Sequence, residues 1–216
     1  MRKRSYGTRL GTGLAAAVLA IGPAAAPSLA NTAKTWTVKP GGSFSGSSGR
    51  VTFTDTATGP PVTCSSSSIS GKLKSGSGLS GSHIASITAF SFTSCVGPAG
   101  LHYTWTTGFF PYYLSADSYA AASGETTATV TGIVAALSGN GCNLVIAGTT
   151  DTTPGKVKGE YINSTQKFKI IGTGSTLQVF HPSVGCDGNG ILWNPGDHVT
   201  ISGTYTVTPK QAITSP

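Results

Sequence analysis

The sequence predicts an all-β protein, an antiparallel β-sandwich or flattened barrel held by two disulfides. Three observations lead to this fold class. Apolar and polar residues alternate with a period of two in many short runs, charged residues make up only 10 % of the chain, and four cysteines are spread through its body. Helices in soluble proteins draw on Glu, Lys, Arg, Leu and Ala for their faces, whereas β-branched residues and glycine turns are typical of sheets.

The alternating runs predict short strands along most of the chain. The run Thr126–Leu137 is read as one long strand, with a helical turn near Ile133 as the alternative, and Gly108 suggests a hairpin turn between the runs on either side of it. The expected strands contain Trp36–Val38, Val51–Phe53, Ile84–Ser91, Leu101–Trp105, Phe110–Leu114, Thr126–Leu137, Leu144–Ala147, Val157–Ile162, Phe168–Ile171, Leu177–Phe180 and Val199–Val207.

Glycines inside the strand patterns predict bends. Ser68–Gly71, Thr129–Gly132 and Thr200–Gly203 each end on a glycine where a strand continues, which usually marks a bulge or a close backbone approach. Such points allow long strands to coil around one core. The segments Trp36–Pro40 and Tyr205–Pro209 resemble each other, and we expect them to lie near one another in the sheet.

The first thirty residues match a secretory signal peptide. A basic leader precedes an apolar run, Leu10–Ala20, which is shorter than the roughly 18 residues that span a bilayer. Small residues at Ser28 and Ala30 predict cleavage after Ala30, with Ala26 as the second choice. We therefore expect a signal peptide at 1–30, a single secreted, extracellular β domain at 31–216, and no membrane span.

The charge of the mature domain is mild. Four of the 14 basic residues lie in the leader, so ten remain against seven acids and the net charge falls from +7 to +3. Nucleic-acid binding needs a clustered basic face interleaved with aromatics, so no nucleic-acid partner is predicted. Lys156, Lys158, Lys167 and Lys169 form two alternating pairs, which we interpret as a solvated or edge-protecting face rather than a binding stripe.

The four cysteines are expected to form two disulfides. None lies in a C-x-x-C pair, and an even count in an exported chain is typical of a disulfide framework. Of the three connectivities, we favour Cys64–Cys95 with Cys142–Cys186, because each pair then links neighbouring segments.

Three segments, Trp36–Gly46, Ser86–Cys95 and Ser202–Val207, resemble a group of small secreted actinobacterial proteins, and the resemblance extends over nearly the whole mature chain, cysteine spacing included. The resemblance implies a secreted β-rich domain of unknown function. It carries over no catalytic residues.

Motifs for catalysis are absent from the sequence. There is no G-x-S-x-G elbow and no H-E-x-x-H, and the four histidines show no metal-ligand spacing. No cofactor or metal is therefore predicted. A catalytic site assembled from distant residues remains one alternative, since such residues meet only in the fold.

An aromatic segment is the candidate ligand surface. His102, Trp105, Phe109, Tyr112 and Tyr113 lie within a dozen residues, and exposed rings on a β scaffold provide flat contacts for sugars. Burial of both faces is the alternative favoured at this stage.

The leading functional hypothesis is a noncatalytic extracellular protein that binds a cell-envelope or environmental polymer, in particular a polysaccharide. A structural or self-associating surface protein is the second hypothesis, suggested by low charge and Thr/Ser/Gly-rich strands. A hydrolase with a dispersed site is the third.

Overall fold

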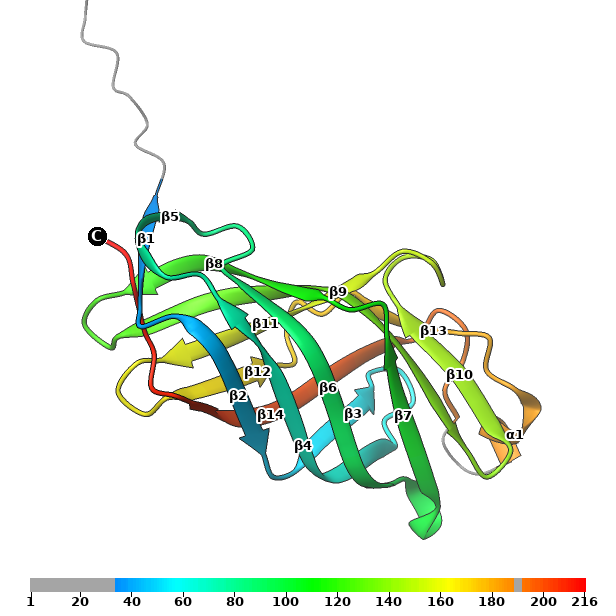
Figure 1. Cartoon of the computed structure of the whole chain (residues 1–216). Coiled ribbons are helices and arrows are strands. Elements are labelled where there is room, and N and C mark those ends of the chain that lie inside the picture. The colour runs from blue at the N-terminus through cyan, green and yellow to red at the C-terminus, as the bar shows by residue number, and fades with distance from the viewer. Residues whose placement is uncertain (1–33, 189–191) are drawn as a thin grey trace, which may run out of the picture. The chain divides into compact units, whose positions relative to one another are not determined.

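The structure is a computed structural model that describes residues 34–188 and 192–216. The signal peptide and its cleavage site lie outside the described residues. Within those residues the regular secondary structure is antiparallel strand, apart from one 3-10 turn and one short helix (Figure 1). The elements are β1 (Thr35–Lys39), β2 (Gly42–Ser48), β3 (Val51–Asp55), β4 (Pro61–Leu73), β5 (Gly76–Ser80), β6 (Ala85–Val96), η1 (Pro98–Gly100), β7 (His102–Gly108), β8 (Tyr112–Ala120), β9 (Glu125–Gly139), β10 (Cys142–Ala147), β11 (Gly155–Ile162), β12 (Lys167–Ile171), β13 (Leu177–Phe180), α1 (Val184–Gly188), β14 (His198–Thr208) and β15 (Ala212–Thr214).

The pairings close into a ring. In order around it, β2, β4, β6, β8, β9, β11, β12 and β14 each pair with the next, and β14 pairs back with β2. Four further strands continue the shorter ones along the same partners. Strand β3 continues β2 between β4 and β14, and β7 continues β8 between β6 and β9. Strands β10 and β13 together continue β11 and β12 between β9 and β14. The predicted fold class is confirmed, in its flattened-barrel form.

Strands β2 and β3 follow one another along the same partner strand, β4. Ser48 pairs with Ser67 on β4 and Val51 with Cys64, so β2 and β3 are one strand interrupted at Gly49 and Arg50. The register on β4 is unbroken across the interruption.

The hairpin expected at Gly108 is wrong for the same reason. Strands β7 and β8 do not pair with each other, because both lie between β6 and β9 and run in the same direction. Gly108 pairs with Val134 and Tyr113 with Thr131, so the chain advances five residues from β7 to β8 while β9 advances only three. The excess residues bulge outward and place Phe109 in the left-handed region, at φ 58°, with its side chain 82 % exposed.

The strand glycines lie where the pattern predicted. Gly71 stands at the register shift between β4 and β6, and β11 skips Gly132 where its register on β9 shifts. Gly203 approaches Val51 closely, since a Cβ added to it would lie 2.9 Å from Val51 Cγ2. The expected long strand is confirmed as β9, with no helical turn at Ile133.

The first and last strands pair differently from the expectation. Strand β1 pairs with β15 and β5 in a separate three-stranded sheet, whereas β14 pairs with β2. The chain passes between the two sheets at Pro40 and at Pro209, where a residue without an N–H ends each ladder. The two similar segments therefore do not pair with each other. Instead, β2, which follows the first segment, pairs with β14, and β15, which follows the second, pairs with β1.

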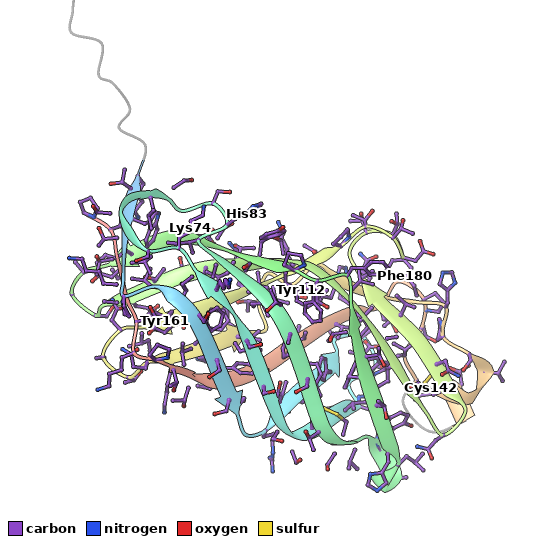
Figure 2. The ribbon with its side chains drawn as sticks, viewed as in Figure 1. Lys74, His83, Tyr112, Cys142, Tyr161 and Phe180 are labelled. Atoms are coloured by element: carbon purple, nitrogen blue, oxygen red, sulfur yellow. A yellow bond between two sulfur atoms is a disulfide. The ribbon has the colours of Figure 1, made fainter. Side chains whose placement is uncertain are left out.

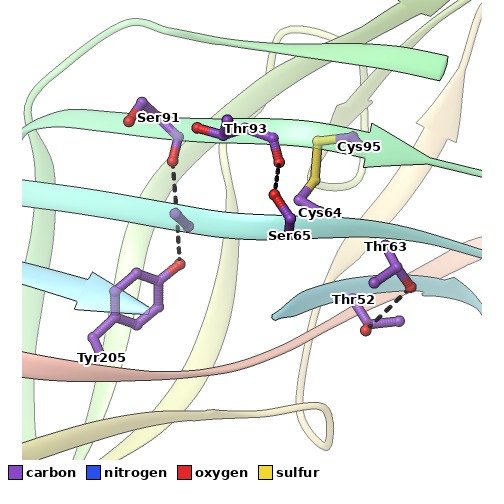
Figure 3. The surroundings of a disulfide bond; sticks show 9 residues. Thr52, Thr63, Cys64, Ser65, Ser91, Thr93, Cys95 and Tyr205 are labelled. Atoms are coloured by element: carbon purple, nitrogen blue, oxygen red, sulfur yellow. Dashed lines mark hydrogen bonds between the residues drawn. A yellow bond between two sulfur atoms is a disulfide. The ribbon is translucent and has the colours of Figure 1, made fainter. Parts of the chain in front are cut away.

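Both favoured disulfides are present. Cys64 and Cys95 are directly opposite each other on β4 and β6 (Figure 3). Cys142 at the start of β10 is bonded to Cys186 in α1. Beside the first bridge, the buried Tyr205 hydroxyl donates to Ser67 Oγ, which donates in turn to the carbonyl of Ser91. This chain of hydrogen bonds links β14, β4 and β6 from within.

The interior of the ring is filled by side chains. Phe53 stacks on Trp105 with ring centroids 4.0 Å apart, and Trp193 is fully buried at the same end. Two apolar cavities remain, of about 40 and 30 Å³. Small-molecule sites occupy roughly 300–1,000 Å³. The interior cavities are smaller than such sites, so the candidate functional site lies on the outer surface.

Candidate functional site

Alternation directs a set of hydroxyl side chains outward over four adjacent strands. Thr206 on β14, Ser47 on β2, Ser68 on β4 and Ser91 on β6 are successive register partners and form one row across the sheet. Adjacent strands lie about 4.8 Å apart, which sets the spacing within the row. The Ser68 and Ser91 hydroxyls hydrogen bond at 2.8 Å.

A second row runs parallel to the first. Thr208, Ser45 and Ser70 are register partners on β14, β2 and β4, and each lies two residues along its strand from the member of the first row. We call these uncharged outward side chains the hydroxyl face, whose members are Ser45, Ser47, Ser68, Ser70, Ser91, Thr206 and Thr208.

The surface is hollowed at two adjoining places. The first hollow, of about 410 Å³, lies over the hydroxyl face, and the second, of about 430 Å³, adjoins it along β2 and β14. The first is lined by Ser45, Gly46, Ser47, Ser68, Ile69, Ser70, Ala89, Phe90, Ser91, Thr206 and Thr208. The second is lined by Ser48, Gly49, Arg50, Thr52, Lys169, Ile170, Ser202, Gly203 and Thr204.

Glycine at inward positions explains the hollows. Gly46 and Gly203 each line one of them, and each occupies a place in its strand where the side chain would point into the core. A Cβ at Gly46 would lie 2.9 Å from Ile69 Cγ1, so β2 approaches the core more closely there than a larger residue allows. Because the backbone lies closer to the core at these glycines, the outer surface is hollowed above them.

The aromatic residues singled out in the sequence do not form one surface. Trp105 and Tyr112 are buried, at 6 % and 1 % exposure, and their inclusion in a ligand surface was wrong. Trp105 stacks on Phe53, and the Tyr112 hydroxyl donates to the Val134 carbonyl at 2.9 Å. Figure 2 labels Tyr112 among the side chains drawn on the ribbon. Burial raises the pKa of Tyr112 to about 12, so its hydroxyl stays protonated as a donor.

The remaining three aromatics are exposed or half-buried but separated. His102 pairs with Val96 and Tyr113 with Ser86, ten residues apart on β6 and therefore roughly 33 Å along the strand. Tyr113 stacks on His83 of the loop before β6, with ring centroids 4.3 Å apart. His102 was expected near Tyr113 because the two runs were read as a hairpin.

A dispersed catalytic site finds little support among the described residues. His181 Nε2 and Asp151 Oδ2 lie 2.8 Å apart, and this hydrogen bond lowers the pKa of Asp151. Both side chains are largely exposed, and no described serine hydroxyl bonds to His181. The described part of the chain also contains no group of three His, Cys, Asp or Glu side chains that could hold a metal ion.

A buried carboxyl group lies at the end of the ring where β3 meets β14, and sequence reasoning missed it. Asp55 is fully buried, and its Oδ1 accepts from the Ala57 and Thr58 amides at 2.7 and 3.2 Å. Its Oδ2 is buried without a hydrogen-bond partner among the described residues. Desolvation raises the pKa of Asp55, and the neighbouring Asp197 carboxyl raises it further. Asp197 itself is half-buried and is held by the amides of Asn194.

The raised pKa of Asp55 predicts that stability declines as pH rises from about 4, the ordinary carboxyl pKa, to that raised value. In that window the folded chain holds a proton that the unfolded chain has released, so the free energy of unfolding falls with pH and then levels off. The substitution Asp55→Asn is expected to remove the decline, as measured by denaturant unfolding between pH 4 and 8. Asp187→Asn, at an exposed position, is the control, and an unchanged slope in Asp55→Asn would contradict the raised pKa of Asp55.

The fold and this surface define a disulfide-linked, closed antiparallel β domain with a hollowed hydroxyl face. No family model, curated protein or solved structure matches the chain. No helix among the described residues is long and apolar enough to cross a membrane.

Proposed function

We propose that the protein is a secreted, noncatalytic domain, of the actinobacterial type that it resembles, which binds a cell-envelope or environmental polysaccharide along the hydroxyl face. The observation that carries this proposal is the pair of adjoining hollows, each within the size range of ligand sites. Serine and threonine hydroxyls both donate and accept, as sugar hydroxyls do, so a row of them complements a glycan chain. Two disulfides support an oxidising compartment.

Binding is tested by co-sedimentation of the mature protein with purified cell wall, chitin and cellulose, at low and high salt. The substitution Ser68→Leu removes a central hydroxyl and fills the first hollow without entering the core. We expect it to weaken binding about ten-fold, through a lost hydrogen bond and a steric block. Thr104→Leu on β7, which is exposed and lines neither hollow, is the matched control and should bind as the wild type does.

Two outcomes would redirect the proposal. Absence of binding to every polymer would overturn it. Loss of binding in Tyr113→Ala but not in Ser68→Leu would move the site to the stack of His83 and Tyr113.

Self-association is the second candidate function. Strand β5 pairs only with β1 in the small sheet, and its residues are mostly exposed. A free edge of this kind presents N–H and C=O groups to another chain. Concentration-dependent assembly in sedimentation, abolished by Ser77→Lys, which places a charge on the exposed β5 edge, would favour this candidate over polysaccharide binding.

A further inference from the structure

The second hollow differs from the first in carrying positive charge. Arg50 lies at the interruption between β2 and β3, and Lys169 lies on β12, with β14 between them. Lys169 is the register partner of Thr204, and Ser202 is the register partner of Thr52. The two cations therefore stand on opposite sides of a floor made by Ser202, Gly203 and Thr204.

Neither cation is neutralised by the described part of the protein. The ion pairs there are Lys158 with Asp117 and His181 with Asp151, and Arg50 and Lys169 form neither an ion pair nor a side-chain hydrogen bond with any described residue. Strand β12 pairs on both sides, with β11 and β14, so Lys169 does not protect a sheet edge. That part of the sequence interpretation was wrong.

One acid lies close to this arrangement. Glu160 on β11 is the register partner of Lys169, on the side away from the hollow, and it forms no ion pair with it. Its carboxylate lowers the positive potential at Lys169 without occupying the hollow. Removing that charge should therefore strengthen anion binding, an effect opposite in sign to the loss of either cation.

The combination of lining groups selects one kind of polymer. An arginine fork binds carboxylate, sulfate or phosphate oxygens through two parallel hydrogen bonds, and lysine provides a compact positive charge. The hydroxyl face beside it is uncharged and suits sugar hydroxyls. Nucleic acid fits less well, because it requires more cations and, for single strands, aromatic side chains on which bases stack.

Resting on the function proposed above, we propose that the bound polysaccharide is acidic, with its anionic groups held between Arg50 and Lys169 in the second hollow and its neutral hydroxyls along the first. The shared chemistry is a negatively charged oxygen group on a glycan, whether carboxylate or sulfate. Arg50 supplies the bidentate contact, and Lys169 the second charge across the floor.

The test compares dextran, carboxymethyl-dextran and dextran sulfate of equal chain length, with affinities measured by titration calorimetry at low and high salt. We expect the charged polymers to bind about ten-fold more tightly than dextran at low salt, with the difference shrinking as salt screens the charges. Arg50→Gln and Lys169→Gln should each weaken binding of the charged polymers by about three-fold, as for exposed charge pairs, and leave dextran unaffected.

Two further variants separate a site from a general charge effect. Glu160→Gln is expected to tighten binding of the charged polymers by about two-fold, which loss of folding would not produce. Lys156→Gln on β11 removes the same charge as Lys169→Gln from an exposed position outside both hollows, and should leave binding unchanged.

The outcomes distinguish this inference from the proposed function. Equal binding of dextran and its charged derivatives, or equal losses in Lys156→Gln and Lys169→Gln, would overturn the acidic specificity and leave polysaccharide binding standing. Binding of a DNA duplex more tightly than dextran sulfate of equal charge would also overturn it. Absence of binding to all three dextrans, to cell wall, to chitin and to cellulose would overturn both.

Discussion

Replacing Cys142 and Cys186 together by serine is expected to lower the free energy of unfolding by about 4 kcal/mol. The bridge joins residues 44 positions apart, so its loss frees a long loop in the unfolded chain. It also ties α1 to β10, where Ser183 adds three hydrogen bonds. Its hydroxyl donates to the Gly141 carbonyl, its amide donates to the Asn143 carbonyl, and the Asn143 amide donates to its hydroxyl. Against a typical domain stability of about 5–15 kcal/mol, this loss is large.

The measurement is guanidinium unfolding of the purified mature protein. Ser183→Ala is the matched control, because it removes the two hydrogen bonds of the hydroxyl, to Gly141 and from the Asn143 amide, and leaves the bridge intact. We expect it to cost about 2 kcal/mol, the usual contribution of two hydrogen bonds. A double serine variant that loses no more than Ser183→Ala would contradict the role assigned to the bridge.

Gly71→Ala is expected to destabilise the fold by about 3 kcal/mol, although it adds a single methyl group. The new Cβ would lie 2.0 Å from the Ser86 carbonyl oxygen and 3.0 Å from Ile87 Cα. These are backbone atoms of β6 at the register shift, so no rotamer change relieves the overlap. The strands β4 and β6 would have to separate locally.

Gly108→Ala provides the comparison for that prediction. Gly108 also lies in a strand, and a Cβ there would meet nothing within 4 Å. We expect a change within about 0.5 kcal/mol, as for ordinary surface substitutions. Similar unfolding midpoints for the two variants would show that β6 yields easily at Gly71.

The local features of the fold follow from the sequence. Period-two alternation places Val38, Tyr103 and Val207 inside because successive side chains of a strand point to opposite faces. The glycine at Gly71 marks a bulge because a Cβ has no room there. The cysteine pairing is correct because Cys64 and Cys95 are register partners on β4 and β6, and because α1 with Cys186 lies against the start of β10 with Cys142. Each of these depends on short-range chemistry.

The site depends on strand pairing between distant segments, which alternation leaves undetermined. Ser47 and Thr206 are neighbours only because β14 returns to β2, and Arg50 and Lys169 line one hollow only because β12 pairs with β14. The same serine and threonine side chains would suit any solvated strand. The sequence by itself therefore determined which residues face outward, their chemistry and the bends of the strands. Only the tertiary structure decided which of them meet, because the order and register of strands far apart in the chain are set by closure and packing of the whole ring.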